Sequence, residues 1–167
     1  RNKDKYYINE LLKSLENFKH VRIIFTLPAF EIGTDTINKE IKNFRKKNKN
    51  SVIFKSLGSI NYLSILKYSD LMIGNSSSGL IEAPALGLKV INIGQRQKGR
   101  ISPKEVINIE CKKKHIINSI KKNLNKKITY KNIYPAISSS KKIVKILEKV
   151  DLSDSIKKNF FDLKKNL

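Results

Sequence analysis

The sequence contains few of the residues that build disulfide frameworks and metal sites. Its 167 residues include one cysteine, Cys111, so no disulfide can form within the chain, and we expect a reducing compartment, the cytoplasm. Cys111 ends an apolar run, which is typical of a buried thiol. Neither of the two histidines stands with Cys, Asp or Glu at the spacing of metal ligands. The sequence therefore predicts no metal site, and we expect no cofactor.

Long apolar runs are absent as well. No stretch approaches the roughly 20 apolar residues that a membrane-spanning helix needs. Residues 1–18 are charged and amphipathic, unlike a signal peptide. We expect no membrane partner. The chain does not begin with Met, which is compatible with its being part of a longer protein.

Acidic residues are scarce relative to basic ones. The chain has 35 Lys and Arg against 14 Asp and Glu, which leaves a net charge of +21. Such a charge is common in nucleic-acid-binding domains, but the lysines here are spread over predicted helices and are not interleaved with aromatic residues. We therefore expect no nucleic-acid partner and keep a basic nucleic-acid-binding domain as an alternative. The positive field favours an anionic ligand in either case.

Short apolar strands alternate with helical patterns along the chain. β-Branched and aromatic runs predict strands at residues 21–27, 51–57, 70–75, 89–94 and 106–110. Apolar residues at helical spacing predict helices at residues 6–19, 36–47, 61–69, 79–88, 112–125, 137–149 and 153–165. The fourth of these helices should end near Gly87. The alternation predicts an α/β fold, a Rossmann-like doubly wound parallel sheet with helices on both faces.

One stretch, IGNSSSGLIEAPALGLKVINIGQRQKGR at residues 73–100, is unusually rich in small residues. Ligands of doubly wound sheets bind beyond the carboxyl ends of the strands, and Asn75 lies at such an end. Residues 76–79, Ser-Ser-Ser-Gly, then begin a predicted helix whose amides and dipole favour a phosphate. Gly79 would let a ligand approach the backbone closely. One serine would suffice to cap the helix, so three serines and a glycine predict a phosphate site.

Four further side chains lie near the same predicted edge. Glu82 is either a first-turn acid, or a capping-box partner, or an acceptor for ribose hydroxyls, and its spacing favours none of these. Arg96 and Arg100 suit bidentate phosphate contacts, although arginines in loops are also common as solvated charges. Tyr62 can stack on a base, but an aromatic in an amphipathic helix more often belongs to the core. These residues predict a phosphate or nucleotide site and no particular reaction.

The same stretch resembles a known family. The runs GNSSSG with a glutamate three residues later, INIG and RQKGR are similar to the hydrolysing UDP-N-acetylglucosamine 2-epimerases of the sialic acid pathway. Similar enzymes act on UDP-N,N′-diacetylbacillosamine in the legionaminic acid pathway. FTLP, YLSILKYSD and SKKIVKIL agree with the same family, so the resemblance covers most of the chain.

The family resemblance implies a two-domain GT-B architecture with the active site between two Rossmann-like domains. The chain resembles the C-terminal, UDP-binding domain, which we expect over residues 1–152. A terminal helix at residues 153–167 would cross to the N-terminal domain of the same polypeptide, the expected partner. Whether the protein forms a homo-oligomer stays open.

The resemblance also implies roles for individual residues. Residues 76–79, called the serine turn below, and Arg96 would hold the UDP diphosphate. Glu82 would contact the ribose hydroxyls, and Tyr62 would lie near the uracil. The implied UDP-binding residues are Asn75, Ser76, Ser77, Ser78, Gly79, Glu82, Arg96, Arg100 and Tyr62, with Arg100 the weaker of the two arginines.

The implied reaction begins with loss of the sugar C2 proton and elimination of UDP. Water then adds to the resulting glycal and releases the free 2-epimer, of the N-acetylmannosamine type. Arg96 would stabilise the charge on the leaving diphosphate. Most acids and bases are expected in the N-terminal domain, so we expect this chain alone to be inactive.

Two positions depart from the family pattern. Ala29 stands where relatives commonly carry the asparagine of a PNAD run, and Pro135 stands in place of a glycine-dependent YGxG turn. Both changes favour a variant N-acyl sugar substrate. A GT-B glycosyltransferase stays an alternative, because such enzymes also hold a nucleotide diphosphate in this domain.

Overall fold

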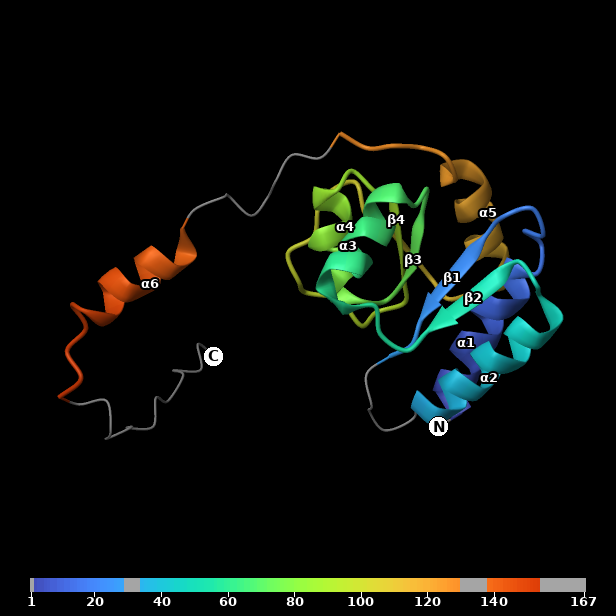
Figure 1. Ribbon diagram of the computed structural model, residues 1–167, viewed down its shortest axis with the longest axis horizontal. Helices are drawn as coiled ribbons and strands as arrows, with labels where there is room; N and C mark the ends of the chain where they lie inside the picture. Colours follow the sequence, from blue (N-terminus) through green and yellow to red (C-terminus); the bar gives the residue numbers. More distant parts are fainter. Residues whose placement is uncertain (1, 29–33, 130–137, 154–167) are drawn as a thin grey trace, which may run out of the picture. The chain divides into compact units, whose positions relative to one another are not determined.

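The computed structural model describes residues 2–28, 34–129 and 138–153, which belong to two compact units (Figure 1). The first unit comprises residues 1–132 and the second residues 133–167. The elements of the first unit are α1 (Asn2–Leu15), β1 (Ile23–Thr26), α2 (Thr34–Lys47), β2 (Ser51–Phe54), α3 (Gly58–Tyr68), β3 (Met72–Gly74), the 3-10 helix η1 (Ser77–Gly79), α4 (Glu82–Ala85), β4 (Val90–Ile93), β5 (Ile107–Ile109) and α5 (Lys113–Asn123). The second unit contains α6 (Ser139–Leu147).

All five strands run parallel to their neighbours, as the alternation of strands and helices predicted. They form two hydrogen-bonded groups, β1 with β2, and β3, β4 and β5 in that order. The two groups share one core, since Phe25 of β1 and Ile91 and Ile93 of β4 belong to the same hydrophobic cluster. The α/β class with parallel, Rossmann-like pairing is therefore confirmed.

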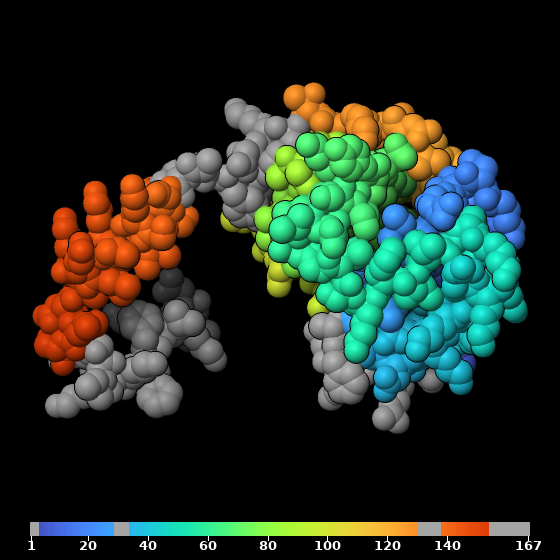
Figure 2. All heavy atoms as spheres, viewed as in Figure 1, coloured from blue at the N-terminus to red at the C-terminus, as the bar shows by residue number. Residues whose placement is uncertain are grey.

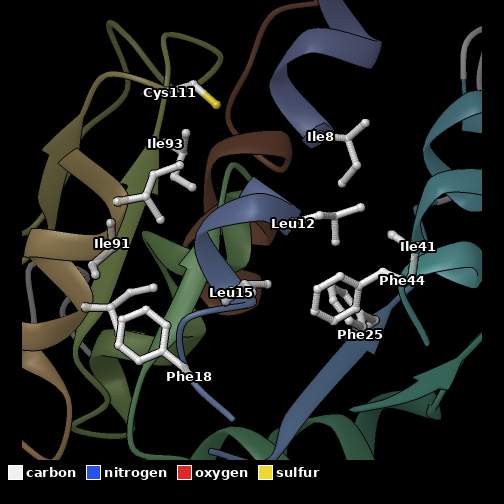
Figure 3. Packing of buried hydrophobic residues seen from close by; sticks show 12 residues of the cluster. Ile8, Leu12, Leu15, Phe18, Phe25, Ile41, Phe44, Ile91, Ile93 and Cys111 are labelled. Carbon is white, nitrogen blue, oxygen red and sulfur yellow. The ribbon is translucent and has the colours of Figure 1, made fainter. Parts of the chain in front are cut away.

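The larger core lies on one side of the strands, beneath α1, α2 and α5. Leu12 and Leu15 of α1 lie between residues of α2 and of β4 in the close view (Figure 3). Phe25 and Phe44 meet edge to face, with ring centroids 5.7 Å apart and planes inclined at 78°, a geometry that aromatic pairs prefer. This core holds the first helices and the strands together.

A smaller core lies on the opposite face of β4, beneath α3 and α4. It consists of Leu66, Leu80, Ala83, Leu88, Val90 and Val106, with Tyr62 and Met72 packed against it. All four residues of β4 are buried, because Ile91 and Ile93 face the larger core and Val90 faces the smaller one. Helices thus cover both faces of β4, as a doubly wound sheet requires. Figure 2 shows α3 and α4 together on one surface of the first unit.

The first helix ends earlier than its apolar spacing predicted. The prediction placed it at residues 6–19, whereas α1 ends at Leu15. The side-chain amide of Asn17 donates to the carbonyl oxygens of Lys13 and Ser14, at 3.2 and 3.1 Å, and so satisfies acceptors that a longer helix would pair internally. Phe18 still reaches the core from the turn that follows.

The second unit has one described helix, α6, which agrees with the prediction for residues 137–149. Residues 154–167 lie outside the described residues, so the terminal helix and the boundary at residue 152 stay predictions. Among the residues that the structure describes, no helix has the length and apolar character to cross a membrane.

Candidate nucleotide-binding site

The carboxyl ends of β3 and β4 lie side by side. The two strands are parallel and pair Gly74 with Asn92, so the chain leaves both strands at the same edge. The serine turn follows β3, and the loop of residues 94–100, here called the arginine loop, follows β4. Gly94 begins this loop with a φ of +77° and donates its amide to the Ile109 carbonyl at 2.9 Å. The two polar segments that the sequence singled out are therefore neighbours.

The serine turn is a short 3-10 helix. Ser76 precedes it in an extended conformation, and its Oγ accepts a hydrogen bond from the Ser78 amide at 3.3 Å. The amides of Gly79 and Leu80 donate to the carbonyls of Ser76 and Ser77, at 3.1 and 2.9 Å. One serine thus caps the turn, as the simpler of the two interpretations proposed.

The prediction of one helix over residues 79–88 was wrong in extent. The stretch is divided into η1 and the four-residue α4. Pro84 explains the break, because it has no amide hydrogen to donate to the Leu80 carbonyl and its ring crowds that carbonyl in a continuous helix. The expected end was right, since Gly87 closes α4 with a φ of +74°.

The short helix changes the electrostatic argument for a phosphate. A macrodipole sums over aligned peptide units, and a turn of three residues supplies little of it. The donors that remain are local: the Ser77 amide, which has no acceptor among the described residues, and the hydroxyls of Ser76 and Ser77. Ser76 is exposed and Ser77 half-buried, whereas Ser78 is buried.

Tyr62 is tied to the serine turn from α3. Its hydroxyl donates to Ser78 Oγ at 2.8 Å, and its half-buried ring packs against the smaller core. These contacts agree with the prediction that Tyr62 belongs to the core. The predicted place near a base stays a prediction.

Gly79 is buried where the turn packs against the strands. A Cβ built on Gly79 would meet Val90 Cγ1 at 3.0 Å and the Met72 Sδ and Cε atoms at 3.8 Å. The sequence pattern predicted that this glycine lets a ligand approach the backbone closely. The structure adds a packing reason, because a side chain here would push Val90 or the turn aside by a few tenths of an ångström. The predicted approach of a ligand stays a prediction.

Glu82 is the first residue of α4 and is exposed. The residue that precedes it as N-cap is Ile81, which has no oxygen in its side chain, so the capping-box interpretation does not apply. Glu82 is a first-turn acid at a place that favours negative charge. Its predicted contact with ribose hydroxyls stays a prediction.

The arginine loop is mostly exposed and has one buried residue, Gln97. Arg96, Lys98 and Arg100 are exposed, whereas Gln97 is only 6% exposed. Gln97 Nε2 donates to the carbonyl oxygen of Asn75 at 2.6 Å and so joins the arginine loop to the end of β3. Gln97 was not among the predicted site residues, because nothing in the sequence pattern separates it from the exposed Gln95.

The described contacts bring together several of the predicted site residues. Hydrogen bonds join Tyr62, Ser78 and Ser76, and Gln97 joins Asn75 to the loop that carries Arg96. Ala29 and Pro135, the two departures from the family pattern, lie outside the described residues. Within the described part of the chain, no group of three or more His, Cys, Asp or Glu side chains is arranged to hold a metal ion.

Cys111 lies in the larger core, as predicted for a buried thiol. Its Sγ donates to the Tyr7 carbonyl at 3.4 Å. Burial, and to a smaller extent the charge of Glu10, raises the pKa of the Cys111 thiol to about 11. The thiol is therefore protonated near neutral pH, unlike a nucleophilic cysteine.

Comparison with known proteins identifies one family for most of the chain. The family described as UDP-N-acetylglucosamine 2-epimerase matches residues 1–148. The chain is 42% identical over 114 residues to "Polysialic acid biosynthesis protein P7" of Escherichia coli, a match that covers 68% of this chain and 29% of that protein.

Two similar relatives carry the name of a reaction. The chain is 41% identical over 104 residues to "GDP/UDP-N,N'-diacetylbacillosamine 2-epimerase (hydrolyzing)" of Campylobacter jejuni, covering 62% of this chain and 27% of the relative. It is 32% identical over 138 residues to "UDP-N,N'-diacetylbacillosamine 2-epimerase (hydrolyzing)" of Legionella pneumophila, covering 82% of this chain and 36% of the relative. The chain thus matches about a third or less of the length of these curated relatives.

Proposed function

Because the chain belongs to the UDP-N-acetylglucosamine 2-epimerase family, we propose that it is the UDP-binding domain of a hydrolysing UDP-sugar 2-epimerase. Relatives that match over 27 to 36% of their length are much longer than this chain. The rest of the active site would come from an N-terminal domain of the same polypeptide, acting in the cytoplasm. The chain alone would bind UDP without turning over a sugar nucleotide.

One observation supports this proposal most strongly. The serine turn and the arginine loop leave adjacent parallel strands, and the Gln97–Asn75 hydrogen bond of 2.6 Å joins them. Donors from both segments can then converge on one anion at the carboxyl edge, where doubly wound sheets bind nucleotides. The Ser77 amide and the serine hydroxyls would contact one side of a diphosphate and Arg96 another.

The proposed chemistry uses this domain to hold the leaving group. A base in the N-terminal domain takes the C2 proton, the C1–O bond breaks, and UDP leaves with the electron pair. Water then adds to the glycal, placing a hydroxyl on C1 and a proton on C2, and so releases the free 2-epimer. Negative charge grows on the diphosphate as the C1–O bond breaks, and donors already in place would stabilise it there.

The proposed substrate is a UDP-N-acyl sugar, either UDP-N-acetylglucosamine or UDP-N,N′-diacetylbacillosamine. The family's description supports the first, and the names of two relatives support the second. The name of the Escherichia coli relative supports a role in making a sialic acid or a related nonulosonic acid.

Titration of the 167-residue chain with UDP tests the binding proposal. We expect saturable binding at up to millimolar UDP, weakened by Glu82→Ala and by Arg96→Ala. Measurement by NMR chemical shifts tolerates low affinity, which a partial cleft would give. No binding at millimolar UDP, or binding that neither substitution alters, would contradict the proposal.

The full-length protein distinguishes an epimerase from a glycosyltransferase. A hydrolysing epimerase releases UDP and free sugar from the donor and water alone, whereas a transferase needs an acceptor. A basic nucleic-acid-binding domain predicts instead a steep salt dependence of binding to DNA or RNA. In that case lysine substitutions on α5 would abolish binding and Ser77→Ala would change nothing.

A further inference from the structure

Gln97 is the buried member of the arginine loop. Its neighbours Arg96 and Lys98 are exposed, and its own side chain is 6% exposed. Its Nε2 donates to the carbonyl of Asn75, 22 residues earlier in the chain, at 2.6 Å. A short bond between loops from different strands fixes where the arginine loop lies relative to the serine turn.

The other end of the Gln97 side chain meets no hydrogen-bond donor in the described part of the chain. Its Oε1 is buried without a hydrogen bond among the described residues. Turning the amide over would set Oε1 against the Asn75 carbonyl oxygen, so the contact with Asn75 fixes the orientation. A buried acceptor without a donor is unfavourable for folding, and an apolar residue of the same length would avoid it. Such a residue would also lose the hydrogen bond to Asn75, so the glutamine keeps the contact between the two loops at the cost of one unpaired buried acceptor.

We propose that Gln97 is a positioning residue that sets the place of Arg96 at the diphosphate. This inference rests on the proposed function. The Gln97 side chain enters the interior and anchors the backbone beside Asn75, and the adjacent Arg96 therefore begins its side chain at a fixed point near the serine turn. In the anchored loop, conformational freedom at Arg96 is already lost before UDP binds. Without the anchor, Arg96 would lose it on binding, and that loss would weaken the affinity for UDP.

The test compares UDP binding by the 167-residue chain and by matched variants. Gln97→Met keeps the length of the side chain and removes both the donor and the unpartnered acceptor. We expect its dissociation constant for UDP to rise about tenfold, which corresponds to about 1.4 kcal/mol, with little change in thermal stability. Gln95→Met, the same substitution at an exposed residue of the same loop, should bind UDP as the unmodified chain does. Gln97→Leu provides a second apolar variant if Gln97→Met does not fold.

A double-mutant cycle with Arg96→Ala separates positioning from a general structural role. If Gln97 acts through Arg96, Gln97→Met should weaken UDP binding in the unmodified chain and change it little in the Arg96→Ala chain. Equal losses in both backgrounds, or no loss in either, would overturn the inference while UDP binding by the unmodified chain still supported the proposed function. Failure of the unmodified chain to bind UDP would overturn the proposed function, and this inference with it.

Discussion

Replacing Gly79 with alanine tests whether the serine turn is held in place by its contact with β4. The added Cβ would lie 3.0 Å from Val90 Cγ1, well inside an ordinary carbon–carbon contact. Val90 is 2% exposed, belongs to the smaller core and has a β-branched side chain with restricted rotamers. Neither the turn nor Val90 can move away without disturbing other buried contacts.

Two opposing effects set the size of the change. Adding a methyl group to a packed interior costs typically about 1 to 3 kcal/mol. Alanine also restricts the unfolded chain more than glycine, which favours folding by about 0.4 to 1 kcal/mol. Overpacking is the larger effect, so we expect Gly79→Ala to lower the free energy of unfolding by about 1 to 2 kcal/mol. For a chain of this size, that lowers the melting temperature by roughly 2 to 8 °C.

Urea and thermal unfolding of four chains complete this test. They are the unmodified chain, Gly79→Ala, Val90→Ala and the double variant. Val90→Ala alone is destabilising because it removes buried methyl groups, but it also removes the atom that the new Cβ would meet. In that background Gly79→Ala should be neutral or stabilising. An equal loss in both backgrounds would refute the packing explanation of Gly79.

Three further predictions concern Tyr62 and Cys111. Tyr62→Phe removes the hydrogen bond to Ser78 and should lower the free energy of unfolding by about 0.5 to 1.5 kcal/mol. In a Ser78→Ala chain, where the bond is already absent, the same substitution should have little effect. Additive losses from the two substitutions would contradict this prediction. Because the pKa of Cys111 is raised from 9.0 to about 11, its alkylation at pH 8 should be about 100-fold slower than that of a free thiol with a pKa near 9. Equal alkylation rates for the folded and unfolded chains would contradict the burial of this thiol. The raised pKa also means that the stability contributed by the protonated thiol is present below pH 9 and is lost as the pH rises through 11. A Cys111→Ala chain should not show this loss.

The fold could be predicted largely from local patterns. The run KVINIG at residues 89–94 was predicted as a strand, and β4 occupies Val90–Ile93 within it. Helix ends were less predictable. Pro84 was visible in the sequence, yet the helix was predicted across it. The end of α1 depends on Asn17, whose side chain turns back to Lys13 and Ser14.

The candidate site was predictable in position and not in its internal contacts. A parallel sheet places the loops after β3 and β4 at one edge, so the motifs alone predicted that these loops would be neighbours. The roles of Gln97, Gly79 and Tyr62 depend on contacts with residues 11 to 22 positions away, namely Asn75, Val90 and Ser78. No periodicity reports which side chain of a polar loop turns inward, so these contacts required the structure.

The most direct test of the account compares the affinities of UDP and UMP. If the serine turn and Arg96 hold the diphosphate, the chain should bind UDP more tightly than UMP, and Arg96→Ala should remove most of that difference. Lys98→Ala removes a positive charge from an exposed neighbouring position and controls for general attraction of anions to a chain of charge +21. A preference for UDP that survives in Arg96→Ala, or falls equally in Lys98→Ala, would contradict the assignment of the diphosphate to this edge of the sheet.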